Sequence, residues 1–454
     1  MIWYYKQVMD VIIHTQVYNG KKTLRRTVDS VLQQTYPDFL YIISDNASTD
    51  GTRDIIKEYA KKDKRIITQY NKVNEFYAYL DVVSECCKNY PDGYWAMLDA
   101  DDEYKPEFIE RMLRHIEQNN LDIAACGSDY YDDKTFELKD GKLIHESLIL
   151  TGTDFSERFS DYHRFTRTVW GKLYSLQLLR KCNFDNVRKM SNFGGDTVFA
   201  LEAFSHANKV GIMPDILHNY YISTSSVTYK WDAKRKDSNV LLDDYKRSFL
   251  IANCGEVTQK NDKFLQFVYF NDCQHMFLIL LSVSMEYYEK TATILDILNE
   301  NKTKAAFCNP NVVELMLTDV QSMLLTWLLT QKETRTSKGA VIAAEIVEVV
   351  YNGSYINHPL LSNVSESNIS YLIIVIIAVL TDNLQAALDE IIRLSEDDIP
   401  DEHVESYLVL ASNICAVNEY AEGWLLFQNE YARFLSDTGR KDEAEVIFKD
   451  LEGF

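Results

Sequence analysis

Residues 8–130 alternate short apolar runs with amphipathic stretches, and this alternation is the feature that most constrains the fold. The apolar runs end in turn-forming or acidic residues, as buried strands do. Between them, apolar residues recur at helical spacing. This order predicts an α/β domain with a mostly parallel sheet covered by helices on both faces. The expected strands are Val11–Val17, Phe39–Ser44, Ile66–Tyr70, Tyr94–Leu98 and one beginning at Ile123–Cys126, and the expected helices are Thr23–Gln34, Asp50–Lys61, Phe76–Lys88 and one beginning at Pro106.

Three polar clusters lie at the carboxyl ends of expected strands: Gln16–Asn19, Asp45–Thr49 and Asp99–Asp102. Ligands of parallel α/β sheets bind beyond these strand ends. We therefore expect the three clusters to line one ligand site.

The acidic cluster reads Asp99-Ala100-Asp101-Asp102 and follows the strand directly. Two carboxylates at positions i and i+2 past a strand end can share one hydrated cation and a ribose. Mg²⁺ and Mn²⁺ prefer such oxygen ligands and keep sites open for phosphate oxygens. The alternative is a set of acidic turn residues that cap the helix near Pro106.

Four further polar residues have a functional interpretation, a structural interpretation or both. Asp45, at a strand end, can accept the N3 proton of uracil, whereas Asp50 is interpreted as a helix cap. Asp196 follows two glycines and precedes a helix, so it is either a general base or an N-cap. His218 follows the apolar run Val210–Leu217 and is either a metal ligand or a core histidine.

The composition excludes some classes of protein. The 47 basic and 68 acidic residues give a net charge of −21, which argues against binding to nucleic acid. Eight cysteines without a CxxC pair predict reduced thiols in a cytoplasmic protein.

The start of the chain lacks the pattern of a signal peptide. The longest apolar run, Tyr371–Leu380, has about half the length of a membrane span, so we expect no transmembrane segment. An enzyme that acts next to a membrane is the alternative.

Helical periodicity dominates from about Trp231 onwards. We expect a first domain over residues 1–230, a helical domain over 231–365 and a helical-repeat region over 366–454. Within the last region Ser370–Leu372 recurs as Ser406–Leu408, and the spacing suits tetratricopeptide-like helical pairs. Unrelated antiparallel helices are the alternative. The segment Gly439–Ala444 is typical of the turn and second helix of such a pair.

Several of these motifs occur in an order, and at separations, that resemble glycosyltransferase family 2 over residues 8–230. Each motif is common by itself, but several in register are specific. The matching segments are Val11–Asn19, Ser30–Tyr36, Ile42–Thr52, Leu98–Asp102, Trp170–Tyr174, Gly194–Phe199 and Asn219–Val227.

The resemblance implies a GT-A fold, a nucleotide-diphosphate sugar donor that is often a UDP-sugar, Mn²⁺ or Mg²⁺, and inversion at the anomeric carbon. It also favours the functional interpretation of the acidic pair and of the candidate base. Carried over by motif, the nucleotide-binding residues are Gln16, Tyr18, Asp45, Asn71 and Asp99, the metal ligands are Asp101 and His218, and the catalytic base is Asp196.

Three positions depart from the family pattern. Gln16 stands where Pro or Thr is usual, which affects the contacts with the base. Gly195 replaces the Glu that precedes the catalytic Asp, which affects its surroundings or acceptor recognition. Asn71–Phe76 keeps the Asn but lacks the usual Gly and Ala-Arg-Asn, so the identity of the donor is open.

We therefore expect an inverting, metal-dependent hexosyltransferase that acts on a hydroxyl of a glycan or glycoprotein. The helical half is expected to recognise the acceptor or to form a homo-oligomer. A nucleotidyltransferase is one alternative, but Tyr18–Lys22 makes a poor phosphate loop. A non-catalytic helical scaffold for another transferase is the other alternative.

Overall fold

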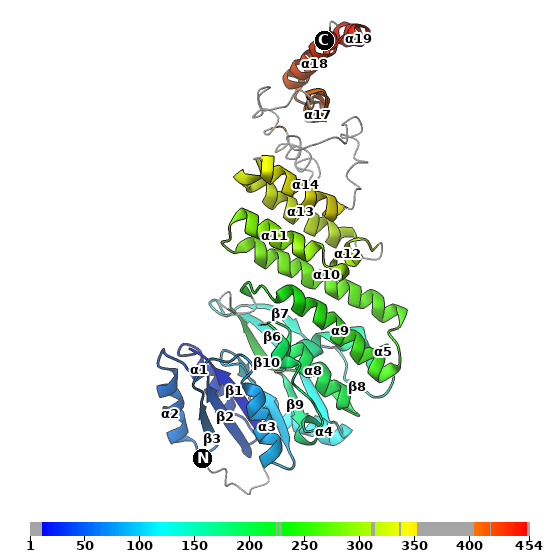
Figure 1. Cartoon of the computed structure of the whole chain (residues 1–454). Helices are drawn as coiled ribbons and strands as arrows, with labels where there is room; N and C mark the ends of the chain where they lie inside the picture. Colours follow the sequence, from blue (N-terminus) through cyan, green and yellow to red (C-terminus); the bar gives the residue numbers. More distant parts are fainter. Residues whose placement is uncertain are drawn as a thin grey trace. The chain divides into compact units, whose positions relative to one another are not determined.

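The chain divides into two compact units, Met1–Leu265 and Gln266–Phe454 (Figure 1). Helix α9 (Arg235–Cys254) belongs to the first unit, where Phe249 packs edge-on against Phe155. The expected division at residues 230 and 365 stays a prediction, and its second boundary lies outside the described residues. The computed structural model describes residues 11–191, 193–223, 226, 229–309, 314–335, 337–351, 388, 404–417 and 419–451.

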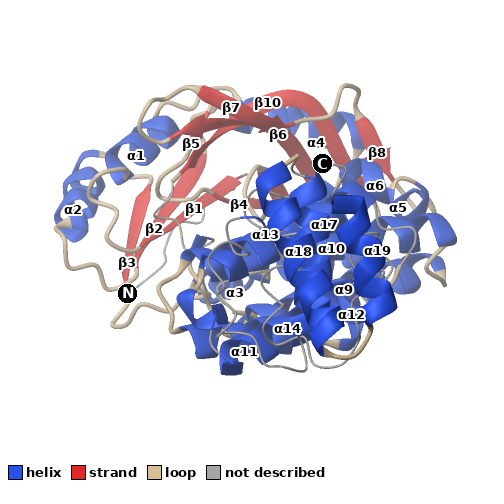
Figure 2. Cartoon of the chain, turned by 90° about the horizontal axis from the view of Figure 1, so that it is seen from above, coloured by secondary structure: helices blue, strands red, loops and turns tan. Residues whose placement is uncertain are grey.

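Within the described residues, the first unit is built on a 10-stranded sheet with the spatial order β3-β2-β1-β4-β9-β6-β10-β5. Strand β7 pairs with β6, and β8 pairs with β10; Figure 2 shows β6, β7 and β10 next to one another in red. The strands are β1 (Val11–Val17), β2 (Phe39–Asp45), β3 (Ile66–Tyr70), β4 (Tyr94–Met97), β5 (Glu103–Tyr104), β6 (Ile123–Asp132), β7 (Leu138–Lys142), β8 (Leu148–Leu150), β9 (Lys172–Ser175) and β10 (Val210–Ile222).

The predicted α/β class is confirmed, with one refinement of the sheet. Strands β3, β2, β1 and β4 run parallel, and so do β6 and β10. Strand β9 lies antiparallel between β4 and β6 and joins the two parallel parts. The sheet is therefore mixed, and the carboxyl ends of β1, β2, β3 and β4 share one edge.

Helices cover both faces of the sheet, because alternate residues of each strand face opposite sides. Ile13 of β1 packs on one face with helices α1, α2 and α4, whereas Ile12 packs on the other with α3, α7 and α8. The helices and short turns of the first unit are α1 (Leu24–Leu32), α2 (Thr52–Lys62), α3 (Tyr79–Asn89), α4 (Phe108–Asn119), α5 (Asp154–Glu157), α6 (Phe159–Tyr162), η1 (His163–Arg167), α7 (Leu176–Leu179), η2 (Val187–Lys189) and α8 (Gly195–His206).

The described part of the second unit is helical, as the sequence predicts. A turn at Gly439, with φ of 89°, separates its last two helices, which is where the sequence places a turn. The first copy of the expected repeat lies outside the described residues, so the tetratricopeptide-like interpretation stays a prediction. The helices are α10 (Gln259–Ser282, which begins in the first unit), α11 (Tyr287–Leu298), α12 (Asn301–Phe307), α13 (Glu314–Thr330), η4 (Lys332–Arg335), α14 (Ser337–Tyr351), α17 (Val404–Val417), α18 (Ala421–Asp437) and α19 (Lys441–Leu451).

In the part of the chain that the structure describes, no helix has both the length and the apolar character that crossing a membrane requires.

Candidate active site

The three polar clusters meet at the shared carboxyl edge of the parallel strands. Asn19 joins the first two clusters, because its backbone N–H donates to Ser48 Oγ (2.8 Å) and its Oδ1 accepts the N–H of Thr49 (2.8 Å). The hydroxyl of Thr23, at the start of α1, donates to the carbonyl of Ala100 in the acidic loop (2.8 Å). This edge is the candidate site.

Asp45 ends β2, and its side chain is fully buried. One carboxylate oxygen accepts the backbone N–H of Ser48 (3.2 Å), and the other accepts the guanidinium of Arg53. Arg53 also donates to the carbonyl of Asn71 (3.1 Å), so it ties the ends of β2 and β3 together. Asp45 therefore holds the loop in shape, and its contact with a nucleobase stays a prediction.

Gln16, Asn71 and Tyr18 lie along the same edge. The Gln16 amide donates to the carbonyl of Phe76 (2.9 Å), while its Oε1 is buried without a hydrogen-bond partner. The Asn71 amide donates to Asn46 Oδ1 (3.1 Å). Tyr18 is 49% exposed, so its ring is free to stack on a flat ligand. The edge thus has one buried acceptor without a hydrogen-bond partner and one open aromatic face.

The acidic loop after β4 crowds several carboxylates together. Burial raises the pKa of Asp99 well above its usual range, and the charges of Asp101 and Asp196 raise it further. Burial likewise raises the pKa of Asp102, with Asp101 and Asp99 adding to the effect. The side chain of Asp101 is exposed, and its backbone carbonyl accepts from Arg26. Carboxylates this close repel one another unless protons or a cation compensate them.

His218 lies on β10 and faces the acidic loop. Its ring stacks on Trp170 at a centroid distance of 4.4 Å, and Nδ1 lies 3.2 Å from Ser128 Oγ. Its Nε2 lies 3.4 Å from Asp102 Oδ2, and neither of these buried atoms has a hydrogen-bond partner. Burial lowers the pKa of His218 well below its usual range, with Lys142 and Lys172 adding to the effect, so the pair is not an ordinary ion pair.

These residues fit a divalent cation. A neutral imidazole nitrogen and a carboxylate oxygen, both orphaned and facing each other, are suitable ligand atoms. Asp99, Asp101, Asp102 and His218 do not bring three ligand atoms within 4.8 Å of one another in the described part of the chain. The assignment of Asp101 and His218 as metal ligands stays a prediction.

Asp196 lies in the first turn of α8, after the N-cap Gly194, whose φ is 92°. Burial raises the pKa of its carboxyl to about 6, although Lys172 and the backbone N–H of Val169 act in the opposite direction. A carboxyl with this pKa is ionised at neutral pH and still able to take a proton, which suits a general base.

Two buried lysines lie behind the site. Lys172 Nζ donates to the carbonyl of Thr168 (2.6 Å), and Lys142 Nζ donates to its hydroxyl (2.9 Å). Burial lowers the pKa of Lys172 to about 7 and that of Lys142 well below its usual range. Both lysines act electrostatically on His218, and Lys172 also acts on Asp196. When protonated, both lysines favour the neutral imidazole, and Lys172 also favours the ionised base.

Tyr77 explains the glycine that precedes the candidate base. Its ring fills the space beside Gly195, because a Cβ placed there would lie 2.3 Å from Cε1 and 2.5 Å from the hydroxyl. The Tyr77 hydroxyl also donates to the carbonyl of Ser191, so the ring lies against Gly195 and is bonded to a residue just before it in the chain. The departure from the family pattern at position 195 is therefore matched by an aromatic side chain from another segment.

We expect Gly195→Ala to lower the free energy of unfolding by about 1–3 kcal/mol, the usual cost of overpacking. Alanine would gain up to about 1 kcal/mol in helix propensity, which is too little to compensate. Chemical denaturation of Gly195→Ala, Tyr77→Leu and the double variant measures the coupling. If the double variant is no more stable than the sum of the single changes predicts, the steric explanation is wrong.

Four residues that shape the site were not predicted individually from the sequence: Asp102, Arg53, Lys172 and Tyr77. Asp102 belongs to the acidic motif, and Lys172 to the segment Trp170–Tyr174, so both lay within motifs already noted. Nothing in the sequence pairs Arg53 with a buried carboxylate or brings Tyr77 to Gly195, because these contacts depend on the tertiary fold.

Known proteins resemble part of the chain. Residues 12–181 match the family described as Glycosyl transferase family 2. The uncharacterized glycosyltransferase EpsJ of Bacillus subtilis is 26% identical over 225 residues, which are 48% of this chain and 62% of EpsJ. Glycosyltransferase GlyA of Streptococcus pneumoniae is 25% identical over 267 residues, 55% of this chain and 36% of GlyA. The chain thus spans less than two thirds of either relative.

Among solved structures, residues 1–349 of S. aureus TarS in complex with UDP-GlcNAc share the fold. The TM-score is 0.50 at 14% sequence identity, and the alignment covers 77% of this chain and 93% of that one. The family match and the mixed sheet agree with the motifs along the first unit. The chain therefore carries a glycosyltransferase family 2 domain with the GT-A fold, followed by a helical region.

Proposed function

We propose that this protein is an inverting, metal-dependent glycosyltransferase that moves a hexose from a nucleotide-diphosphate sugar to a hydroxyl of a glycan or glycoprotein. The observation that carries the proposal is the position of Asp196. This carboxyl, whose pKa burial raises to about 6, interacts electrostatically with Asp99 of the acidic loop. A base and a charge-compensating centre on one edge are what such a displacement needs.

In this mechanism Asp196 takes the proton of the acceptor hydroxyl as its oxygen attacks the anomeric carbon. The attack comes from the face opposite the leaving diphosphate, so the configuration inverts in one displacement. Lys172 and the N–H of Val169 favour the ionised carboxylate before the attack.

Asp101, Asp102 and His218 would hold Mn²⁺ or Mg²⁺, and Asp99 would face the ribose. When bound, the cation would supply positive charge for the departing diphosphate. The two orphaned atoms of Asp102 and His218, 3.4 Å apart, support this assignment.

The nucleotide would lie along the ends of β1, β2 and β3. We assign its base to Gln16, Tyr18, Asp45 and Asn71, of which Tyr18 is exposed and Gln16 has an unused acceptor. A UDP-sugar is our choice of donor, and the UDP-GlcNAc bound to TarS is in keeping with it.

Donor turnover tests the proposal. Purified full-length protein is incubated with Mn²⁺ and a panel of UDP-, GDP- and dTDP-sugars, and the release of free nucleoside diphosphate is measured. We expect release from one donor, lost in Asp101→Ala. If no donor of the panel releases nucleoside diphosphate and no metal-dependent nucleotide binding is found, a non-catalytic helical scaffold would be favoured instead.

The rate of transfer should depend on pH through Asp196. Its pKa is raised to about 6, so the base form is present above pH 6 and is protonated as the pH falls through this value. We expect kcat to fall about tenfold for each pH unit well below 6. Initial rates between pH 4.5 and 8, with unfolding monitored in parallel, give the profile. A rate that is flat between pH 5 and 7 would contradict the role of Asp196.

We also propose that the helical region recognises the acceptor or forms a homo-oligomer. Light scattering of the full-length protein gives its mass in solution. Equal rates toward the same acceptor with and without residues 266–454 would exclude a role in acceptor recognition.

A further inference from the structure

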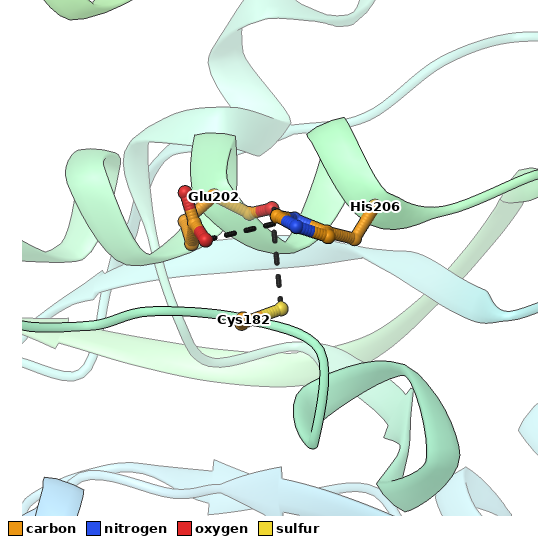
Figure 3. A group of neighbouring side chains, drawn as sticks. All are labelled: Cys182, Glu202 and His206. Atoms are coloured by element: carbon orange, nitrogen blue, oxygen red, sulfur yellow. Dashed lines mark hydrogen bonds and ion pairs between the residues drawn. The ribbon is translucent and has the colours of Figure 1, made fainter.

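A second group of metal-binding side chains lies at the far end of α8 from the candidate base. Glu202 and His206 are one turn apart near the end of this helix, and Cys182 follows α7. Figure 3 shows the three side chains pointing toward one another. Their ligand atoms, the Cys182 sulfur, a Glu202 carboxylate oxygen and a His206 ring nitrogen, all lie within 4.8 Å of one another.

The distances suit one shared cation. His206 Nδ1 lies 3.5 Å from Glu202 Oε1. In a tetrahedral zinc site with bonds of about 2.0–2.1 Å, nitrogen and oxygen ligands lie about 3.4 Å apart. The Cys182 sulfur lies within 4.8 Å of both of these atoms, so a small shift would bring it to bonding distance of the same cation.

We propose that Cys182, Glu202 and His206 form a second metal site for Zn²⁺ or a similar thiolate-binding cation. One sulfur, one nitrogen and one oxygen ligand select zinc or cobalt over magnesium, which prefers oxygen alone. The site lies at the carboxyl end of α8, where the helix dipole favours a cation. A water molecule would complete four-coordination.

Contacts between the Cys182 segment and α8 hold the three residues near one another without a metal. Glu202 Oε1 accepts the backbone N–H of Asn183 (2.7 Å), which holds the carboxylate toward the Cys182 segment. Phe184 stacks on Phe199 of α8 at a centroid distance of 4.2 Å. Because the loop and the helix are already joined, the cation would meet a nearly preformed site.

Binding has two costs. His206 Nδ1 would exchange its contact with the Glu202 carbonyl (3.0 Å) for the cation. Cys182 would lose its proton, and this loss costs free energy because burial raises the pKa of the free thiol to about 12. Both are ordinary for zinc, whose ligands are deprotonated as it binds. The bound cation would then fasten the Cys182 segment to the helix whose first turn carries Asp196.

Cobalt titration tests this site without reference to activity. Full-length protein, stripped of metal and kept reduced, is titrated with Co²⁺ alone. We expect a thiolate-to-cobalt charge-transfer band and a tetrahedral visible spectrum, both removed by added Zn²⁺. His206→Gln changes an exposed side chain and removes one ligand, so it should weaken Co²⁺ binding at least about tenfold. Cys182→Ser should abolish the charge-transfer band.

Two variants serve as controls. Cys308→Ser removes an exposed thiol elsewhere in the chain and should leave the band unchanged. Asp101→Asn changes the acidic loop and should also leave it unchanged, which separates this site from the proposed active-site cation. A wild-type protein without a charge-transfer band, or a band that survives in Cys182→Ser, would overturn the proposal.

Discussion

Asp196→Asn should lower kcat for sugar transfer by about 10²–10⁴-fold, the usual contribution of a positioned general base. Asparagine keeps the shape of the side chain but cannot accept the acceptor proton. Its interactions with the donor should change little, because the carboxylate would act only on the acceptor. The measurement is initial-rate kinetics with saturating donor, together with calorimetric binding of the nucleoside diphosphate.

Asp38→Asn is the matched control, since it removes one exposed carboxylate far along the sequence from the acidic loop and from α8. It should leave kcat and binding at wild-type levels. If Asp196→Asn retained more than about a tenth of the wild-type kcat, the base would have to be another group. Equal loss of nucleotide binding and kcat would point to a disturbed fold instead.

Asp102→Asn should remove most of the metal-dependent activity, by about 10²–10³-fold, which corresponds to a few kcal/mol of lost charge stabilisation. The asparagine Oδ1 can still accept the backbone N–H of Tyr221 (2.9 Å), so the loop should keep its shape. Its amide would face His218 Nε2 in place of the orphaned oxygen. A neutral amide is a poor ligand for Mn²⁺ compared with a carboxylate.

Mn²⁺ titrations of donor turnover measure this effect, with thermal unfolding as a check on the fold. The concentration of Mn²⁺ needed for half-maximal rate should rise steeply in Asp102→Asn and stay unchanged in Asp38→Asn. A variant that keeps the wild-type Mn²⁺ dependence would show that the Asp102–His218 pair is a structural contact only.

Local patterns predicted the elements of the first unit because each depends on neighbouring residues. The strands Val11–Val17 and Ile66–Tyr70 have the predicted bounds. Helix α2 begins at Thr52 with Gly51 as its N-cap, and Asp50, expected to cap the helix, lies one residue before Gly51 and accepts the Thr52 N–H (3.0 Å). Element ends of this kind depend on side-chain bonds that a periodic pattern does not contain.

Other features could not be read from the sequence, because they join segments far apart in the chain. The antiparallel strand β9 separates β4 from β6, whereas the alternation alone predicts a mostly parallel sheet. The nucleobase contact of Asp45 stays a prediction from its motif, and only the structure shows that Arg53 bonds its buried carboxylate. Such pairings follow from the packing of several elements at once.

The sequence by itself determined the α/β class, the order of the first strands and the polar clusters at their ends. These depend on periodicity and on turn residues, which are local properties. Only the tertiary structure decided that His218 faces Asp102, that Tyr77 fills the space beside Gly195, and that burial raises the pKa of Asp196. Chain segments that meet only after folding determine which groups are buried and which are in contact. Burial and these contacts in turn determine the chemistry of the site.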